Sequence, residues 1–195
     1  MLLWQKHRPL PEEDVVQLEK EILDIRGGKL EDVYYTNYPL ECEEDRQDSP
    51  KNTHKEFYSS IIQEMVIDMG LNFGPRSVVE PHWFQMYNSD TCTHELHDHF
   101  KLSEDIMCLI SWVHIIKDVP DEQDCFYFKN HRGQQLSPQP QSAGWVFAFP
   151  SWQAHGVRSI TTPGVNRIIA AGNLAFQIAP CTTLTEEELY EEKED

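Results

Sequence analysis

Residues 144–173 read GWVFAFPSWQAHGVRSITTPGVNRIIAAGN, and this stretch decides the fold class of the chain. Aromatic and β-branched residues follow Gly144 and end at Pro150, which is the pattern of a strand that stops at a proline. The TTPG sequence at 161–164 is a turn signal, and the run NRIIAAGN after it is typical of a last strand. The stretch therefore predicts β-strands, with His155 placed five residues beyond the first of them.

Similar short runs fill the second half of the chain from about residue 76. They are RSVVEPHWFQMYN, IMCLISWVHIIKDV and DCFYFKN, and Gly, Pro, Asn and Asp separate them. Many short strands joined by turns predict a sandwich or barrel of roughly eight strands. No internal repeat is visible.

The first 75 residues have a helical pattern instead. Residues 11–28 carry apolar side chains at helical spacing: Val15, Leu18, Ile22 and Ile25. Residues 53–70 predict a second helix, in which Thr53 and Glu56 form a capping-box pattern. The apolar stripe of this helix, which we expect to pack on a sheet, is Phe57, Ile61, Met65 and Met69.

These patterns predict a mainly β protein with supporting helices. We expect a single domain over 1–195, with a helical support region at 1–75, a β core at 76–180 and an acidic tail at 181–195. Hydrophobic residues make up 39% of the 195 residues and charged residues 25%, which is typical of a globular domain.

Composition also excludes several kinds of partner. The net charge of −17 has the wrong sign for binding nucleic acid. No run of about 18 apolar residues predicts a membrane span, and the first residues do not have the pattern of a signal peptide, so we expect a cytoplasmic protein. Five cysteines without a CxxC pair indicate neither a disulfide framework nor a cysteine-rich zinc site. We expect Cys108 and Cys125, which lie in apolar runs, to be buried thiols.

Three histidines lie close together in HELHDH, residues 94–99. Side chains at i and i+2 of a strand share a face, so His97 and His99 can converge on one ion, whereas His94 and Asp98 are expected to face away. An H-x-H pair is a weak signal unless a distant strand supplies a third ligand, and His155 is the candidate. The other histidines are interpreted as packed (His82 and His114) or as ordinary surface residues (His7, His54 and His131).

Arg167 lies twelve residues after His155, inside an apolar strand pattern. A buried arginine needs an anion or a carboxylate partner. A metal site beside such an arginine suits a chelating dicarboxylate, whose 2-oxo-acid end binds the metal while its distal carboxylate pairs with the guanidinium. Arg158 and Lys129 are alternative anchors for that carboxylate.

From about residue 78 to 178 the chain resembles the 2-oxoglutarate- and Fe(II)-dependent dioxygenases of the prolyl-4-hydroxylase-like kind. The resemblance rests on HDH at 97–99, on ISWVHIIKDV, and on FPS followed by His155, Arg167 and Asn173. In its H-x-H signature the chain is similar to phage and bacterial oxygenases. The resemblance implies a double-stranded β-helix, also called a jelly roll and cupin-like, with N-terminal helices packed on the major sheet.

The resemblance also implies the site residues and cofactors. It implies Fe(II) bound by His97, His99 and His155, and 2-oxoglutarate bound by Arg167 with a hydrogen bond from Tyr87. Ascorbate as a reductant belongs to the same expectation. A phage-encoded protein of this kind would work in the host cytoplasm.

Position 99 departs from the pattern of these enzymes, most of which use a carboxylate as the second ligand. His99 would give a three-histidine site, which also accepts Zn(II), Ni(II) or Cu(II). Asp98 is the alternative ligand if the strand is not regular.

The leading hypothesis is therefore a dioxygenase that hydroxylates a peptide side chain or a small molecule. One alternative is a cupin-like barrel that binds a metal without oxygenase turnover, which would give Arg167 no role. A second is a non-catalytic barrel that would tolerate loss of the histidines. Neither the prime substrate nor the oligomeric state can be read from the sequence.

Residues 100–105 could form a lid, and the candidates for an aromatic wall are Trp83, Phe84, Trp112, Tyr127 and Trp152.

Overall fold

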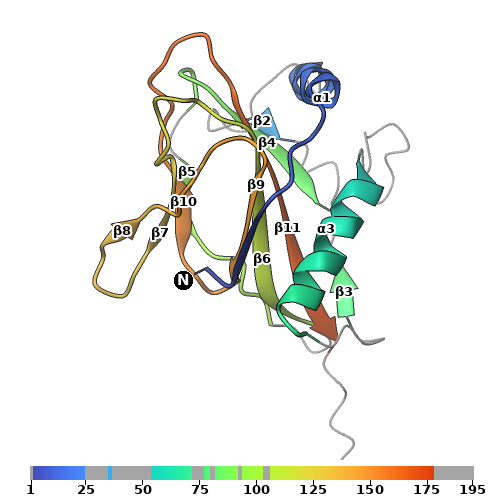
Figure 1. Ribbon diagram of the computed structural model, residues 1–195. Coiled ribbons are helices and arrows are strands. Elements are labelled where there is room, and N and C mark those ends of the chain that lie inside the picture. The colour runs from blue at the N-terminus through green and yellow to red at the C-terminus, as the bar shows by residue number, and fades with distance from the viewer. Residues whose placement is uncertain are drawn as a thin grey trace, which may run out of the picture.

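The computed structural model describes residues 2–24, 35–36, 54–71, 77–79, 82–91, 94–102 and 106–177. This part of the chain forms two antiparallel β-sheets and two helices, α1 (Glu12–Asp24) and α3 (Lys55–Asp68). In Figure 1 the smaller sheet lies at the left, the larger sheet in the middle and α3 at the right. The predicted fold class, mainly β with supporting helices, is confirmed. The expected acidic tail at 181–195 and residues Ile25 and Thr53 lie outside the described residues.

The larger sheet is built around two long central strands, β6 (Ile106–Lys117) and β11 (Arg167–Gln177). These strands pair along nearly their whole length. The strand order is β1-β9-β6-β11-β4-β2, and β3 also pairs with β11. The remaining strands of this sheet are β1 (Trp4–His7), β2 (Tyr35–Thr36), β3 (Ser77–Val79), β4 (Trp83–Tyr87) and β9 (Trp145–Pro150).

The smaller sheet has four strands in the order β5-β10-β7-β8. They are β5 (His94–His97), β7 (Phe126–Lys129), β8 (Gln135–Leu136) and β10 (His155–Val157). The quoted stretch therefore contributes strands to both sheets, since β9 and β11 belong to the larger sheet and β10 between them belongs to the smaller one. This switch between sheets brings His155 to face the inner side of β11.

The first 75 residues are not purely helical. β1 pairs with β9, with Trp4 opposite Ala148, and β2 pairs with β4, so this region also supplies two strands to the larger sheet. Residues 1–75 therefore share the sheet with the core that we expected to begin at residue 76.

The helices cover the outer face of the larger sheet, which buries the apolar stripe of α3 as predicted. Ile61 and Met65 are buried there against outward-facing side chains of β11 such as Ile168 and Leu174, and Phe57 and Met69 pack at the edge. The N-cap residue of α3 is His54, which makes no side-chain capping hydrogen bond, and Thr53 of the predicted capping box lies outside the described residues.

A second apolar core fills the space between the two sheets. It contains Ile169 and Ala171 of β11 together with Phe126, Phe149 and Val157. Alternate residues of β11 therefore face opposite cores, as the two-residue period of a strand requires. By this alternation, Arg167 and Asn173 lie on the inner face with Ile169 and Ala171.

Candidate metal centre

The candidate metal centre lies where β5 and β10 pair at the open edge of the smaller sheet. His97 and His155 are opposite each other in this pair, and Val157 is opposite His94. His155 and Val157 are two positions apart in β10, whereas their partners His97 and His94 are three positions apart, so β5 carries one extra residue here, which is a bulge. His99 lies beyond the end of β5, and its backbone N–H donates to the carbonyl of Ser151 at 2.8 Å.

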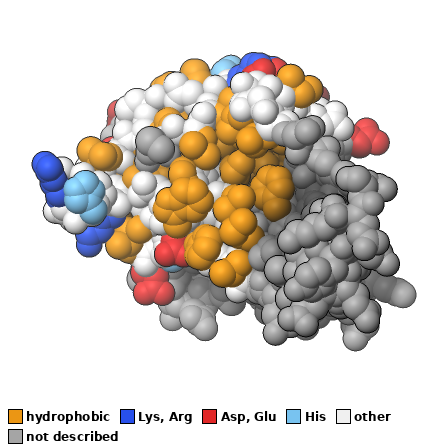
Figure 2. Space-filling view, turned by 90° about the horizontal axis from the view of Figure 1, so that it is seen from below, with side chains coloured by type: hydrophobic (Ala, Val, Ile, Leu, Met, Phe, Trp, Pro, Cys, Tyr) orange, Lys and Arg blue, Asp and Glu red, His pale blue; other side chains and the backbone are white. Residues whose placement is uncertain are grey.

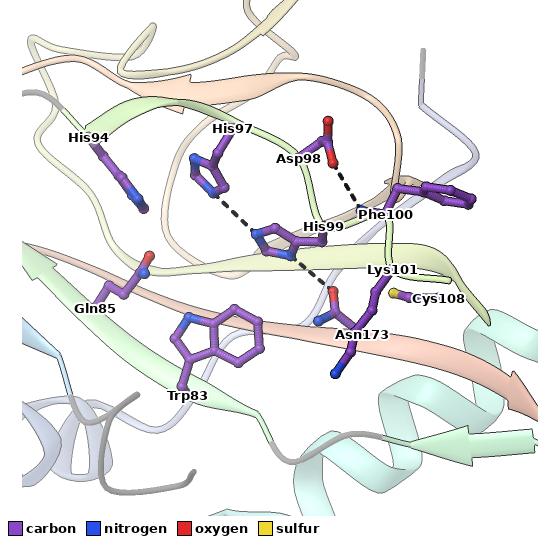
Figure 3. A pocket seen from close by; sticks show the side chains of 10 residues that line it. All are labelled: Trp83, Gln85, His94, His97, Asp98, His99, Phe100, Lys101, Cys108 and Asn173. Atoms are coloured by element: carbon purple, nitrogen blue, oxygen red, sulfur yellow. Dashed lines mark hydrogen bonds between the residues drawn. The ribbon is translucent and has the colours of Figure 1, made fainter. Parts of the chain in front are cut away.

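The structure brings the three predicted ligands together. One ring nitrogen from each of His97, His99 and His155 lies within 4.8 Å of the others. The Nε2 atoms of His97 and His99 are 3.1 Å apart, and a dashed line joins the two rings in Figure 3. Asp98 takes no part in this cluster, since its carboxylate is exposed and accepts a hydrogen bond from the backbone N–H of Phe100 at 3.1 Å.

Hydrogen bonds to the other ring nitrogens explain how the three imidazoles are oriented. The Nδ1 atoms of His97 and His155 lie 2.8 and 2.9 Å from the carbonyl oxygens of Glu95 and Gln153. The Nδ1 atom of His99 lies 3.0 Å from a side-chain oxygen of β11. Because each neighbour is an acceptor, each Nδ1 carries the proton and each Nε2 presents its lone pair.

The donor set fits a divalent transition metal ion. Two lone pairs facing each other at 3.1 Å repel unless a proton or a cation lies between them. Two imidazole nitrogens each about 2.1 Å from one ion, at roughly a right angle, would be about 3 Å apart, close to the observed separation. Oxygen acceptors behind the Nδ1 atoms are the usual support for metal-binding histidines.

The electrostatics of the cluster keep His155 neutral, which is the form that binds a metal. Burial, together with the proximity of His97 and His99, lowers the pKa of His155 to about 2. The ring is 3% exposed, so a charge on it would be poorly solvated.

The sequence rule placed His94 on the opposite face, and the structure corrects this. The bulge in β5 turns the ring toward the site, where it stacks on His97 with centroids 4.3 Å apart and an interplanar angle of 24°. Burial lowers the pKa of His94 to about 3, with the neighbouring His97 and His99 rings adding to this effect. His94 lies outside the group of three converging nitrogens.

Tyr87, predicted to hydrogen-bond a cosubstrate, is buried beside this fourth histidine. Its hydroxyl donates to Oε1 of Gln85 at 2.9 Å and lies 3.0 Å from Nδ1 of His94. On the neighbouring strand, Arg167 is directly opposite Tyr87. The tyrosine therefore lies between the histidine cluster and the predicted anchor.

Arg167 is completely buried and only partly satisfied. Its Nη2 donates to Oε1 of Gln141 at 3.0 Å, whereas Nε and Nη1 have no hydrogen-bond partner among the described residues. Burial lowers the pKa of Arg167, and the nearby Cys125 and Tyr87 oppose this shift. A buried cation with two unpaired donors is costly and suits an anionic ligand.

The alternative anchors are engaged or exposed. Arg158 pairs with Asp124 at 2.7 Å and stacks over the ring of Tyr127, and Lys129 is exposed at the end of β7. Among the three, only Arg167 is buried on the inner face of the larger sheet.

A cavity of about 390 Å³ opens in front of the histidines (Figure 3). Its lining residues are Trp83, Gln85, His94, His97, Asp98, His99, Phe100, Lys101, Cys108 and Asn173. A smaller space behind it is bounded by the triad together with Ile169 and Ala171. Arg167 lies deeper along the same strand face and does not line either space.

Only one candidate for the aromatic wall lines this cavity. Trp83 does so, whereas Phe84 and Trp112 belong to the core beneath the helices. Tyr127 is buried and Trp152 is 58% exposed. The packed histidines were predicted correctly, since His82 and His114 are buried against Tyr58.

Several large apolar side chains are exposed close to the cavity. Leu96, Phe100, Leu102 and Trp152 are each at least 40% exposed. The bond from His99 to Ser151 brings the segments of Phe100 and Trp152 side by side. Figure 2 shows that hydrophobic side chains gather on the underside of the molecule.

No family model matches the sequence, and no curated protein matches it significantly. Solved structures with a similar fold include a prolyl-4-hydroxylase from Pseudomonas putida, at 16% identity and TM-score 0.55 over 90% of this chain and 92% of that one. A viral collagen prolyl hydroxylase from Paramecium bursaria Chlorella virus-1, in its 2-oxoglutarate complex, matches at 10% identity and TM-score 0.58 over 89% and 94%. The non-heme, alpha-ketoglutarate-dependent carbocyclase SnoK matches at 16% identity and TM-score 0.55 over 95% and 85%.

The chain has the fold of these oxygenases. The two facing sheets are therefore the major and minor sheets of a double-stranded β-helix, as the resemblance implied. At 9–16% identity this likeness concerns the fold, so the chemistry has to be argued from the side chains.

Proposed function

We propose that the protein is a non-haem Fe(II)- and 2-oxoglutarate-dependent dioxygenase. The observation that carries this proposal is the convergence of three Nε2 lone pairs, from His97, His99 and His155, inside a double-stranded β-helix. When bound, Fe(II) and 2-oxoglutarate would supply oxidative decarboxylation to succinate and carbon dioxide, coupled to insertion of one oxygen atom of O2 into a substrate C–H bond.

The three histidines would hold the metal from one side only. Their Nδ1 atoms are fixed by acceptors, so the rings need not reorient when an ion binds. Three protein ligands on one face leave positions for the cosubstrate and O2, as in facial triads with one carboxylate. A three-histidine site carries one negative charge less than such a triad.

Arg167 is the group that favours a dicarboxylate cosubstrate. Its unpaired Nε and Nη1 can donate hydrogen bonds to the distal carboxylate of 2-oxoglutarate as a bidentate pair. Tyr87, opposite Arg167 in the sheet, can donate to the same molecule after its hydroxyl leaves Gln85. The buried surroundings of Arg167 exclude water, which strengthens this ion pair.

The prime substrate would enter through the cavity of about 390 Å³. We infer a peptide side chain or a small molecule with an apolar portion, because Trp83 lines this cavity and Phe100 is exposed at its rim. A cupin-like barrel without turnover is the second candidate. It would use the same histidines but offers no reason for an unpaired buried cation at position 167.

Uncoupled turnover tests the proposal without knowledge of the prime substrate. Protein purified without a histidine tag and loaded with Fe(II) is incubated with 2-oxoglutarate, ascorbate and air, and succinate is measured. We expect slow succinate formation that His155→Ala abolishes. If the iron-loaded protein produces no succinate above the variant, the non-oxygenase barrel becomes the better description.

A further inference from the structure

We propose that Asn173 is the positioning residue that orients His99 for metal binding, through a hydrogen bond from the ring Nδ1–H to its side-chain oxygen. This inference rests on the proposed function, because it takes His99 as a ligand. Among the three converging rings, only His99 uses a side chain in this way, at 3.0 Å. His97 and His155 each use the carbonyl oxygen of the residue two positions earlier.

His99 uses a side-chain acceptor, and the other two rings use backbone carbonyls, because the three histidines lie at different places in the fold. His97 and His155 belong to paired strands, and the carbonyl beside each ring comes from Glu95 within β5 or from Gln153 in the turn just before β10. His99 lies past the end of β5, where its backbone N–H donates to the carbonyl of Ser151. Its ring therefore depends on a residue 74 positions away in the sequence, on the long central strand β11.

Asn173 is itself held in a single orientation by a chain of buried hydrogen bonds. Its Oδ1 also accepts the hydroxyl proton of Ser111, its partner across the sheet, at 2.8 Å. Because Ser111 donates to Asn173, it accepts from Ser151 at 3.0 Å, and Ser151 in turn accepts from the thiol of Cys108 at 3.1 Å. The hydrogen bonds of this series all run in one direction, toward Oδ1 of Asn173, which also accepts the proton of His99.

The consequence for the metal site concerns the tautomer. With Asn173 as acceptor, His99 carries its proton on Nδ1 and directs the Nε2 lone pair toward Nε2 of His97, 3.1 Å away. Without that acceptor the ring can rotate or move its proton to Nε2, which cannot then bind a metal. A carboxylate at position 99 would need no such partner, since both of its oxygens are acceptors.

The test compares Asn173→Ala with Asn173→Asp, which keeps an acceptor oxygen. In the Zn(II)-loaded wild type we expect separate Nδ1–H resonances for His97, His99 and His155 in proton–nitrogen NMR spectra. Asn173→Ala should remove or exchange-broaden the His99 resonance alone and weaken Zn(II) binding about tenfold to a hundredfold. Asn173→Asp should restore both.

The matched control is Asn130→Ala. Asn130 also accepts two hydrogen bonds through Oδ1, from Arg132 and Gln134, but it lies in the exposed β7–β8 turn. An unchanged His99 resonance and unchanged affinity in Asn173→Ala would overturn the inference. Nitrogen shifts of the metal-free protein report the same tautomer. If the wild type binds no metal, the proposed function is refuted, but the nitrogen shifts of the metal-free protein still show whether Asn173 sets the tautomer of His99.

Discussion

In the proposed function, metal binding depends on the ring nitrogens of the triad. His155→Ala removes the most buried of the three and should reduce bound iron or zinc to background, measured by elemental analysis of tag-free protein. His94→Ala is the matched control, because that ring stacks on His97 but lies outside the converging group. Equal metal loss in both variants would mean that four histidines bind the ion.

Position 99 distinguishes the two possible second ligands. His99→Asp would supply a carboxylate oxygen where an imidazole nitrogen now lies, and it should retain part of the metal affinity. Asp98→Ala should have little effect, since the Asp98 carboxylate is exposed and bonds the Phe100 backbone. Loss of metal in Asp98→Ala, measured by titration with Zn(II), would transfer the ligand role to Asp98.

Residue rules predicted the proximity of part of this site. The i, i+2 spacing of His97 and His99 and a third histidine after a strand pattern indicated that these residues converge, although the pairing of β5 with β10 was not predicted. The sequence indicated an anionic partner for Arg167 because this charged residue interrupts an apolar strand pattern. The role of His94 and the bond to Asn173 were missed, since a bulge and a contact across 74 positions leave no periodic signal.

Gly156 of the short strand β10 allows β10 to lie close to β5, the strand that carries His94 and His97. A Cβ added at Gly156 would lie 2.8 Å from the hydroxyl of Tyr127 and 3.1 Å from the carbonyl oxygen of His94. Gly156→Ala should therefore push β5 away from β10, destabilise the fold by about 1–3 kcal/mol and weaken metal binding. Urea unfolding and Zn(II) titration measure the two effects.

Tyr127→Phe provides the control for this steric argument. It removes the hydroxyl that the new methyl group would meet first, so the double variant should recover part of the stability lost in Gly156→Ala. A Gly156→Ala protein with wild-type stability and affinity would show that the strands tolerate the shift.

Elements with strong local patterns were predicted more successfully than those fixed by pairing. Helix α3 was recognised because its apolar residues repeat at helical spacing. Strands β1 and β2 were missed because four and two residues carry too little pattern, and only their partners β9 and β4 define them. The end of β5 before His99 was missed for the same reason.

Acid stability of the whole molecule should reflect its buried neutral histidines. Burial lowers the pKa of His114 to about 3, and its Nδ1 lies 3.1 Å from the hydroxyl of Tyr58, beneath α3. In the unfolded chain the value returns to 6.5. As pH falls below 6.5 the unfolded chain therefore binds a proton that the folded protein does not, and the free energy of unfolding decreases.

For this one residue the decrease between pH 7.5 and 5.0 is about 2 kcal/mol. The free energy of unfolding is measured with urea at pH 7.5 and pH 5.0. Its decrease between the two pH values should be about 2 kcal/mol smaller in His114→Gln than in the wild type. His131→Gln, at an exposed position, should leave the wild-type pH dependence unchanged. If His114→Gln also leaves it unchanged, the ring is charged or solvated in the folded protein.

No helix in the described ranges is long and apolar enough to cross a membrane. Between the two sheets, the triad lies beside the middle of β11, near Ala171 and Asn173, and Arg167 is the first residue of that strand. The proposed function therefore requires 2-oxoglutarate to extend from the triad to Arg167 through that interior.

The most direct test is a titration of 2-oxoglutarate into the anaerobic Fe(II)-loaded protein, followed by metal-to-ligand charge-transfer absorption. The wild type should develop a saturable band. Arg167→Ala should bind iron normally but need about tenfold to a hundredfold more 2-oxoglutarate, since it loses a charged pair of roughly 1.5–3 kcal/mol. Arg167→Lys should recover part of the loss. An iron-loaded wild type without a band, or an unchanged dissociation constant in Arg167→Ala, would contradict this account.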